Sequence, residues 1–113
     1  MRRVFLALLL SIPHTALFAA DDVECRPIPS SFRLRGVPKP PEVVEAESLA
    51  EMAKEPGRLP QVPFGFSNKS WNEFKAEMQE GDLLVAYIGN ALGGHVLLRR
   101  GCFVGVFNTM VIG

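Results

Sequence analysis

The chain has 113 residues, of which 48% are hydrophobic, and its 12 basic side chains balance its 12 acidic ones. This length predicts one domain, near the lower end of what can bury an adequate core. The chain thus lacks the excess of basic residues that is typical of nucleic-acid-binding proteins, and it has no acidic tail. We therefore expect no nucleic-acid partner.

The first twenty residues have the pattern of a secretory signal peptide. They open with two arginines, continue with an apolar run over residues 4–12 and end at small residues, with cleavage expected after Ala19 or Ala20. The alternative is a retained anchor, but the run is shorter than the roughly 20 apolar residues that span a bilayer. We predict a signal peptide over residues 1–20, an exported protein (periplasmic or secreted) and no stable membrane span after cleavage.

Two cysteines remain after cleavage, Cys25 and Cys102. An even number of cysteines in an exported chain favours a disulfide, which would tie the first mature residues to the C-terminal strands. On the chain-entropy account such a long loop stabilises by roughly 4 kcal/mol. The alternative is two separate thiols, with Cys102 buried as a small hydrophobic side chain.

Residues 21–41 contain five prolines, which remove amide donors and fix φ, so we expect an irregular segment there. The alternation of Phe32 and Leu34 with arginines permits a short edge strand. A helix is predicted over residues 42–55, with one charged, solvated face. Its apolar face is expected at Val43, Ala46, Leu49, Ala50 and Ala53, and its charged face at Glu47, Glu51, Lys54 and Glu55.

A loop follows over residues 56–67, in which Phe64 and Phe66 are expected to attach the loop to the core. Ser70, followed three residues later by Glu73, predicts a capping box at the start of a second helix. Gly81 fits the C-terminal cap of this helix.

Strands are predicted over residues 83–88, 95–99 and 102–110, with a glycine-rich loop over residues 89–94 and a hairpin turn at Arg100-Gly101. Short connections favour an antiparallel meander. We therefore expect an α+β fold with two helices and a small three-stranded antiparallel sheet, forming a domain over residues 42–113. The predicted core residues are Trp71, Phe74, Leu84, Val96, Leu98 and Val104.

Few residues in the sequence suggest chemistry. After cleavage His95 is the one histidine, and no phosphate-binding loop, catalytic triad or clustered metal ligands are seen, so no catalytic residue, metal or cofactor is predicted. By period-two alternation His95 and Arg99 share one face of a strand. They are the residues at which we expect a polar site, if the sheet has one.

Residues 81–84 (GDLL), residues 95–98 (HVLL) and the turn that follows them resemble the strands of the NlpC/P60 family of cell-wall cysteine peptidases. The resemblance implies a thiol hydrolase that uses His95, with Asp82 or Tyr87 orienting the imidazole. The family places its cysteine at a helix N-terminus upstream of these strands. Here the upstream cysteine is Cys25, and the Arg-Pro-Ile-Pro that follows it does not start a helix.

A second pattern covers roughly the last 45 residues. Trp71 and Phe74, then Gly81-Asp82, then residues 97–101 (LLRRG) resemble a plan found in small exported bacterial proteins of unassigned function. The resemblance supports the helix-and-hairpin architecture. The lack of a catalytic set, together with strand residues 83–88 that are apolar on both faces, predicts a non-catalytic exported protein that binds another protein or an envelope component, either as a homodimer or with a separate partner. The alternative is the thiol hydrolase.

Overall fold

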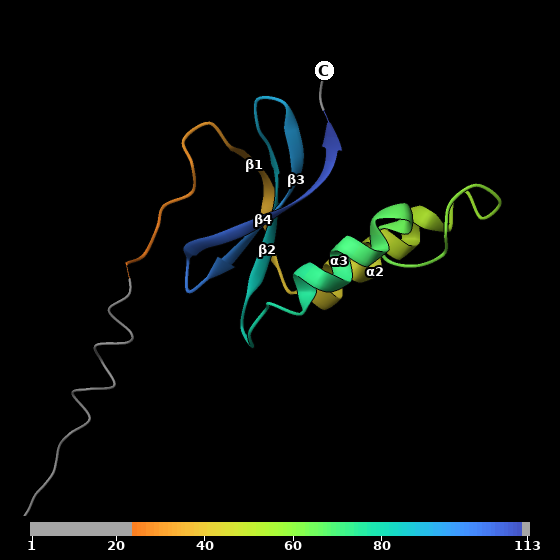
Figure 1. Ribbon diagram of the computed structural model, residues 1–113, viewed down its shortest axis with the longest axis horizontal. Helices are drawn as coiled ribbons and strands as arrows, with labels where there is room; N and C mark the ends of the chain where they lie inside the picture. Colours follow the sequence, from red (N-terminus) through yellow and green to blue (C-terminus); the bar gives the residue numbers. More distant parts are fainter. Residues whose placement is uncertain (1–23, 112–113) are drawn as a thin grey trace, which may run out of the picture.

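The computed structural model describes residues 24–111, so the predicted signal peptide lies outside the described residues. Within this range two α-helices pack on one face of a four-stranded antiparallel sheet (Figure 1). The elements, in chain order, are β1 (Arg33–Lys39), α2 (Pro41–Met52), the 3₁₀ turn η1 (Gly65–Ser67), α3 (Asn68–Lys75), β2 (Leu83–Ile88), β3 (Leu92–Arg99) and β4 (Cys102–Val111). None of the helices in this range has both the length and the apolar character needed to cross a membrane.

The α+β class and the antiparallel meander are confirmed, but the predicted number of strands is wrong. The sheet has four strands in the order β1-β2-β3-β4, because β1 forms within the proline-rich segment and pairs with β2. The register shifts between Arg35 and Lys39, where Gly36 has φ +86° and Pro38 follows. A bulge on an edge strand accommodates a proline, since the missing amide is not needed for pairing there.

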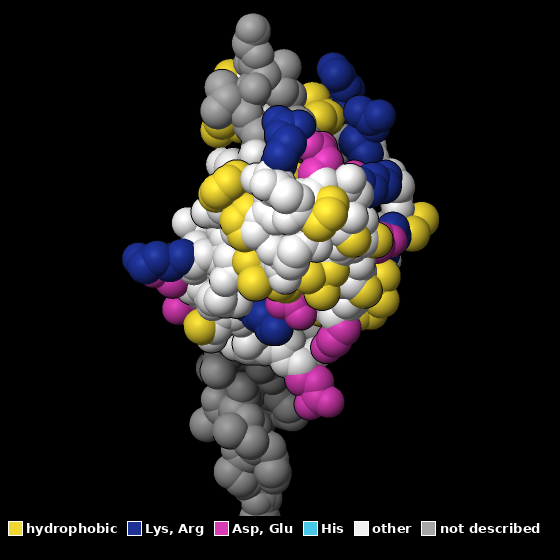
Figure 2. Space-filling view, turned by 90° about the vertical axis from the view of Figure 1, so that its right-hand side faces the viewer, with side chains coloured by type: hydrophobic (Ala, Val, Ile, Leu, Met, Phe, Trp, Pro, Cys, Tyr) yellow, Lys and Arg dark blue, Asp and Glu magenta, His cyan; other side chains and the backbone are white. Residues whose placement is uncertain are grey.

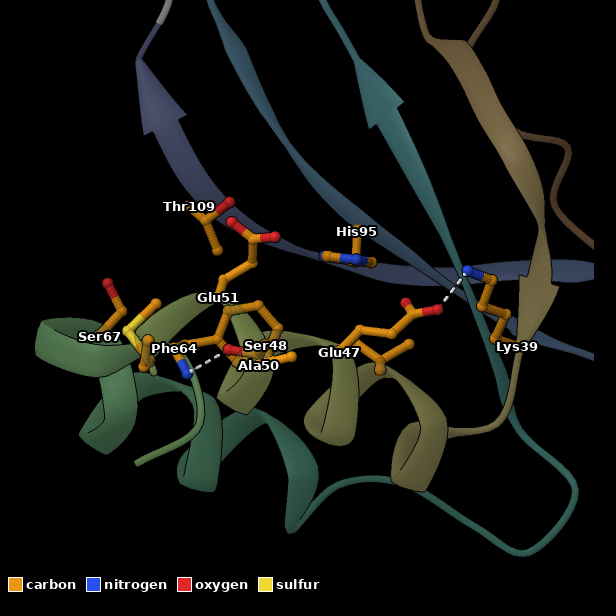
Figure 3. Close-up of a pocket in the computed structure, with 11 residues that line it drawn as sticks. Lys39, Glu47, Ser48, Ala50, Glu51, Phe64, Ser67, His95 and Thr109 are labelled. Carbon is orange, nitrogen blue, oxygen red and sulfur yellow. Dashed lines mark hydrogen bonds and ion pairs between the residues drawn. The ribbon is translucent and has the colours of Figure 1, made fainter. Parts of the chain in front are cut away.

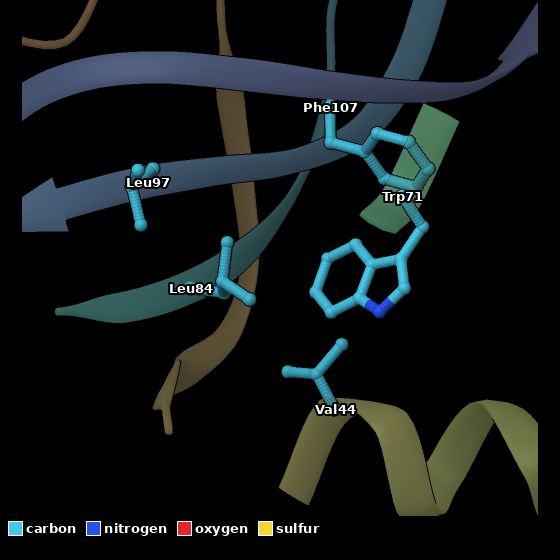
Figure 4. Close-up of a cluster of buried hydrophobic side chains, with 5 residues drawn as sticks. All are labelled: Val44, Trp71, Leu84, Leu97 and Phe107. Atoms are coloured by element: carbon cyan, nitrogen blue, oxygen red, sulfur yellow. The ribbon is translucent and has the colours of Figure 1, made fainter. Parts of the chain in front are cut away.

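The helix-facing side of the sheet holds the larger part of the core (Figure 4). Trp71 of α3 is fully buried, and its indole Nε1 donates a 2.6 Å hydrogen bond to Glu45 of α2. Burying side chains of this size stabilises by roughly 1.5–3 kcal/mol each. The buried members of this cluster are Val44, Trp71, Leu84, Leu97 and Phe107, with Phe64, Phe74, Met78 and Val104 packed around them.

Helix α2 presents a different face to the sheet from the one predicted. Its buried residues are Val44 and Ser48, whereas Val43 and Leu49 of the predicted apolar face are 41% and 40% exposed. Val44 packs with Trp71 and Phe64, and Ser48 accepts a hydrogen bond from the Phe64 N–H, so these contacts fix the face that α2 buries. The apolar pattern of this helix is therefore a poor guide to its orientation.

Helix α3 begins at Asn68, so the predicted capping box at Ser70 is wrong. The turn η1 runs directly into α3, which places Ser70 inside the helix, and Glu73 instead pairs with Lys69 at 3.3 Å. The helix ends at Lys75, six residues before Gly81. Gly81, at φ +89°, lies in the turn before β2 and does not cap the helix.

The opposite face of the sheet is covered by the N-terminal strap, which we define as residues 24–32. The sulfur atoms of Cys25 and Cys102 lie at disulfide-bonding distance, with Cα atoms 5.2 Å apart. Phe32 stacks on Tyr87 with ring centroids 4.2 Å apart, and Ile28 packs beside it. The strap covers the buried side chains of Val85, Tyr87, Val96 and Leu98.

Strand β3 begins at Leu92, within the predicted glycine-rich loop. A Cβ atom on Gly94 would lie 2.0 Å from the backbone oxygen of Phe107, so glycine is required there for the strands to approach. Next to this contact, Thr109 is an extra residue in β4, between Asn108, which pairs with Gly94, and Met110, which pairs with Gly93. This bulge brings Thr109 to the edge of the cavity described next.

Candidate functional site

A cavity of about 760 Å³ lies between α2 and the sheet (Figure 3). Its floor is apolar, and polar groups surround it from α2, β1, β3, β4 and η1. We call this cavity the groove; its lining residues are Lys39, Val44, Glu47, Ser48, Ala50, Glu51, Met52, Phe64, Ser67, His95 and Thr109. Ligand sites are commonly concave and mostly apolar, with a few polar groups that fix orientation.

His95 extends from β3 into the middle of the groove (Figure 3). Its Nδ1 atom is buried and has no hydrogen-bond partner among the described residues. Burial lowers the pKa of His95 below 6.5, with Glu47 and Lys39 acting in opposite directions as smaller effects. The imidazole is therefore neutral at pH 7, with one hydrogen-bond donor and one acceptor.

Charged side chains lie at both ends of the groove. At one end Lys39 and Glu47 form a 2.6 Å ion pair, and at the other Glu51 lies across from Thr109 (Figure 3). Glu51 also pairs with Lys54, but both side chains are about two-thirds exposed, and such pairs are worth little. The lining thus carries one more acidic than basic charge, and it favours a ligand with a positive group near Glu51.

Phe64 forms the apolar floor under His95, and its backbone is strained. Its φ of +62° is left-handed, a region that residues other than glycine rarely adopt. The backbone N–H of Phe64 donates a 2.7 Å hydrogen bond to Ser48 Oγ, and its ring centroid lies 4.6 Å from that of Trp71. Strain of this kind, held in place by surrounding contacts, is often found at ligand sites. Phe66 was expected to pack likewise, but it is 80% exposed.

The structure places Arg99 away from the groove. Its guanidinium forms two 2.9 Å hydrogen bonds with the carboxylate of Asp82, whose side chain is fully buried. The backbone N–H of Gln79 donates a third hydrogen bond to this carboxylate. Arg99 and these bonds lower the pKa of Asp82, so the carboxylate stays ionised. His95 and Arg99 lie four residues apart on β3, about 13 Å by strand rise, and form two separate clusters.

The thiol-hydrolase hypothesis finds no support in this arrangement. Cys102 pairs with Arg99 across the β3–β4 hairpin, whereas His95 pairs with Phe107, so the sulfur and the imidazole lie apart along the sheet. The two proposed orienting groups are also engaged elsewhere: Asp82 binds Arg99, and the Tyr87 hydroxyl donates to Asn108. While Cys25 and Cys102 are bonded, neither can supply a thiolate.

Sequence reasoning found His95 but missed most of the groove. The charge pattern of α2 predicts a solvated face for Glu47 and Glu51, and no motif in the sequence marks Thr109. Within residues 24–111 no group of three or more His, Cys, Asp or Glu side chains is placed to hold a metal ion. No known protein family matches the chain, and no curated protein or solved structure is detectably similar to it.

Proposed function

We propose that this chain is an exported, non-catalytic binding protein, and that the groove between α2 and the sheet binds an apolar group of its partner. The observation that carries the proposal is the unpartnered imidazole of His95 above an apolar floor in an open cavity. Buried polar atoms in folded proteins are nearly always hydrogen-bonded, so an unsatisfied His95 Nδ1 beside a cavity marks this place as one where function outweighs stability. A peptide segment of another protein fits this combination, because its apolar side chain can occupy the floor while its polar main chain or side chains meet the polar groups of the rim.

The proposal is tested with a library of random twelve-residue peptides displayed on phage, selected on the exported, disulfide-bonded protein. Thr109→Trp fills the groove from β4, where the native side chain is exposed. Ala46→Trp is the matched control, because Ala46 is exposed on α2 and does not line the groove. Both variants are checked for folding by circular dichroism before binding is measured.

Enriched peptides should bind the wild-type protein and Ala46→Trp equally, and should bind Thr109→Trp at least about tenfold more weakly, the equivalent of about 1.4 kcal/mol. Peptides that bind all three proteins alike would place the binding surface outside the groove. Peptides that fail only with Ala46→Trp would assign binding to the exposed apolar face of α2. A selection that enriches no peptide would contradict the proposed function outright.

A further inference from the structure

The two edges of the sheet differ in their protection against strand pairing. The β1 edge carries Arg33 and Arg35, Pro38 and the bulge at Gly36. Exposed charges, prolines and bulges are the usual means by which proteins prevent an edge strand from pairing with another chain. The β1 edge is therefore closed to an incoming strand.

The β4 edge lacks such protection over much of its length. Its ten residues (CFVGVFNTMV) include no charged side chain. The strap covers only its start, where the Phe103 N–H donates a 2.8 Å hydrogen bond to the Arg26 carbonyl and the Arg26 guanidinium donates to Val104 O. Beyond this point none of the described residues pairs with the outer edge of the strand. We call residues 105–109 the free edge of β4.

The free edge and the groove are continuous with each other. Thr109 belongs to both, because the bulge turns it toward Glu51 at the open end of the groove. In Figure 1 the C-terminal half of β4 rises at the outer side of the sheet, above the helices. A strand laid along this edge would direct alternate side chains toward the groove.

We propose that the partner contributes an extended peptide segment, which adds to the free edge of β4 as a fifth strand. In such an arrangement main-chain hydrogen bonds supply affinity and pockets for alternate side chains supply specificity. One apolar side chain of the segment enters the groove above Phe64, and a Lys or Arg two residues away, on the same face of the strand, meets Glu51. This assignment deepens the proposed function and rests on it.

The charges favour a separate partner over a second copy of this chain. Pairing of two β4 edges would bring together two acidic grooves, and residues 102–111 include no Lys or Arg to meet Glu51. Pairing of β4 with β1 of another copy would require the edge that arginines, a proline and a bulge protect. A basic and apolar segment of another protein avoids both problems.

The test is an N-methyl scan of a peptide selected as described above. In an added strand alternate amides bond to β4 and the others point to solvent. Methylation of an amide that bonds to β4 should weaken binding about tenfold or more, and methylation of the others by less than about twofold. The dissociation constant of each peptide is measured by isothermal titration calorimetry, with light scattering to follow the oligomeric state.

Three results would overturn strand addition. The first is a peptide that fails to bind Thr109→Trp but whose affinity shows no alternation along the N-methyl scan. This result would support binding in the groove and would reject the added strand. A stable homodimer that dissociates as peptide binds would make a second copy the occupant. Failure to enrich any peptide would contradict strand addition and the proposed function together. Alternation together with a monomeric protein supports the proposal.

Discussion

Two polar clusters lie on the same face of β3, and they differ in whether their hydrogen-bonding groups are satisfied. Around Arg99, the buried Asp82 carboxylate accepts three hydrogen bonds from within the chain. Around His95, the buried Nδ1 has no partner among the described residues, and a cavity opens beside the ring. The first cluster holds the loop between α3 and β2 against β3. The second cluster remains available to a ligand.

The contrast distinguishes a residue that stabilises the fold, Arg99, from a residue that is available for binding, His95. The residue types alone do not make this distinction. Arg99 and His95 were grouped as one polar site because they share a strand face. Arg99 has a structural role, because its guanidinium neutralises the buried carboxylate of Asp82. The same carboxylate accepts a hydrogen bond from the backbone N–H of Gln79. His95 faces α2, whose lining side chains leave space beside it (Figure 3).

The largest expected effect comes from Arg99→Ala. It leaves the Asp82 carboxylate buried without its counter-charge, and breaking a pair in this way costs about 3–5 kcal/mol. Asp82→Asn should cost less, because the remaining Arg99 side chain is 27% exposed and can reach water. Both free energies of unfolding are measured with urea. A loss below about 1 kcal/mol for Arg99→Ala would show that the two clusters do not differ as described.

A smaller effect on the free energy of unfolding is expected from pH. The lowered pKa of His95 costs stability in acid, whereas the lowered pKa of Asp82 adds stability above its own titration. Because burial lowers the pKa of His95, the unfolded chain binds more protons below 6.5, so stability falls as pH drops through this window. The pKa of Asp82 is also lowered, but Asp82 is an acid. Its contribution to the free energy of unfolding is therefore fully present above pH 3.8 and is lost only as the pH falls further. Peptide affinity should follow the His95 window, since an imidazolium repels a basic segment.

The control for this prediction is His95→Gln, which keeps a polar side chain that does not titrate. Charged groups near the imidazole come from β1 and α2 (Lys39, Glu47 and Glu51), and they remain in the variant. The loss of affinity between pH 7 and 5 should disappear in His95→Gln. A pH profile that persists in the variant would assign the titration to another group.

The sequence predicted the β2–β3–β4 meander, because alternation and turn residues are local signals. The even number of cysteines favoured a Cys25–Cys102 pair over two separate thiols, and the two sulfur atoms lie at disulfide-bonding distance. It misplaced the buried face of α2, where alanines on one side gave an apolar pattern although Val44 and Ser48 face the core. That orientation is a tertiary effect, because Val44 packs with Trp71 and Phe64, which lie far from it in the sequence. The groove was missed for the same reason, since Glu47 and Glu51 approach His95 only once α2 is rotated this way.

The exposed apolar side chains at the helical end are the main alternative to the groove as a binding site. Figure 2 shows them in small groups between charged side chains. Val62 is 38% and Phe66 80% exposed there. Scattered exposed hydrophobic residues are normal, whereas a binding site is expected where they are contiguous or concave.

The most direct test of the account is a titration of the ¹⁵N-labelled protein with a selected peptide, followed by NMR. We expect the largest backbone amide shifts at Glu51, His95 and Thr109, with those of Asp82 and Arg99 unchanged. This result would show that the unsatisfied cluster binds and the satisfied one does not. Largest shifts at Asp82 and Arg99, or at the exposed residues of the helical end, would contradict the account.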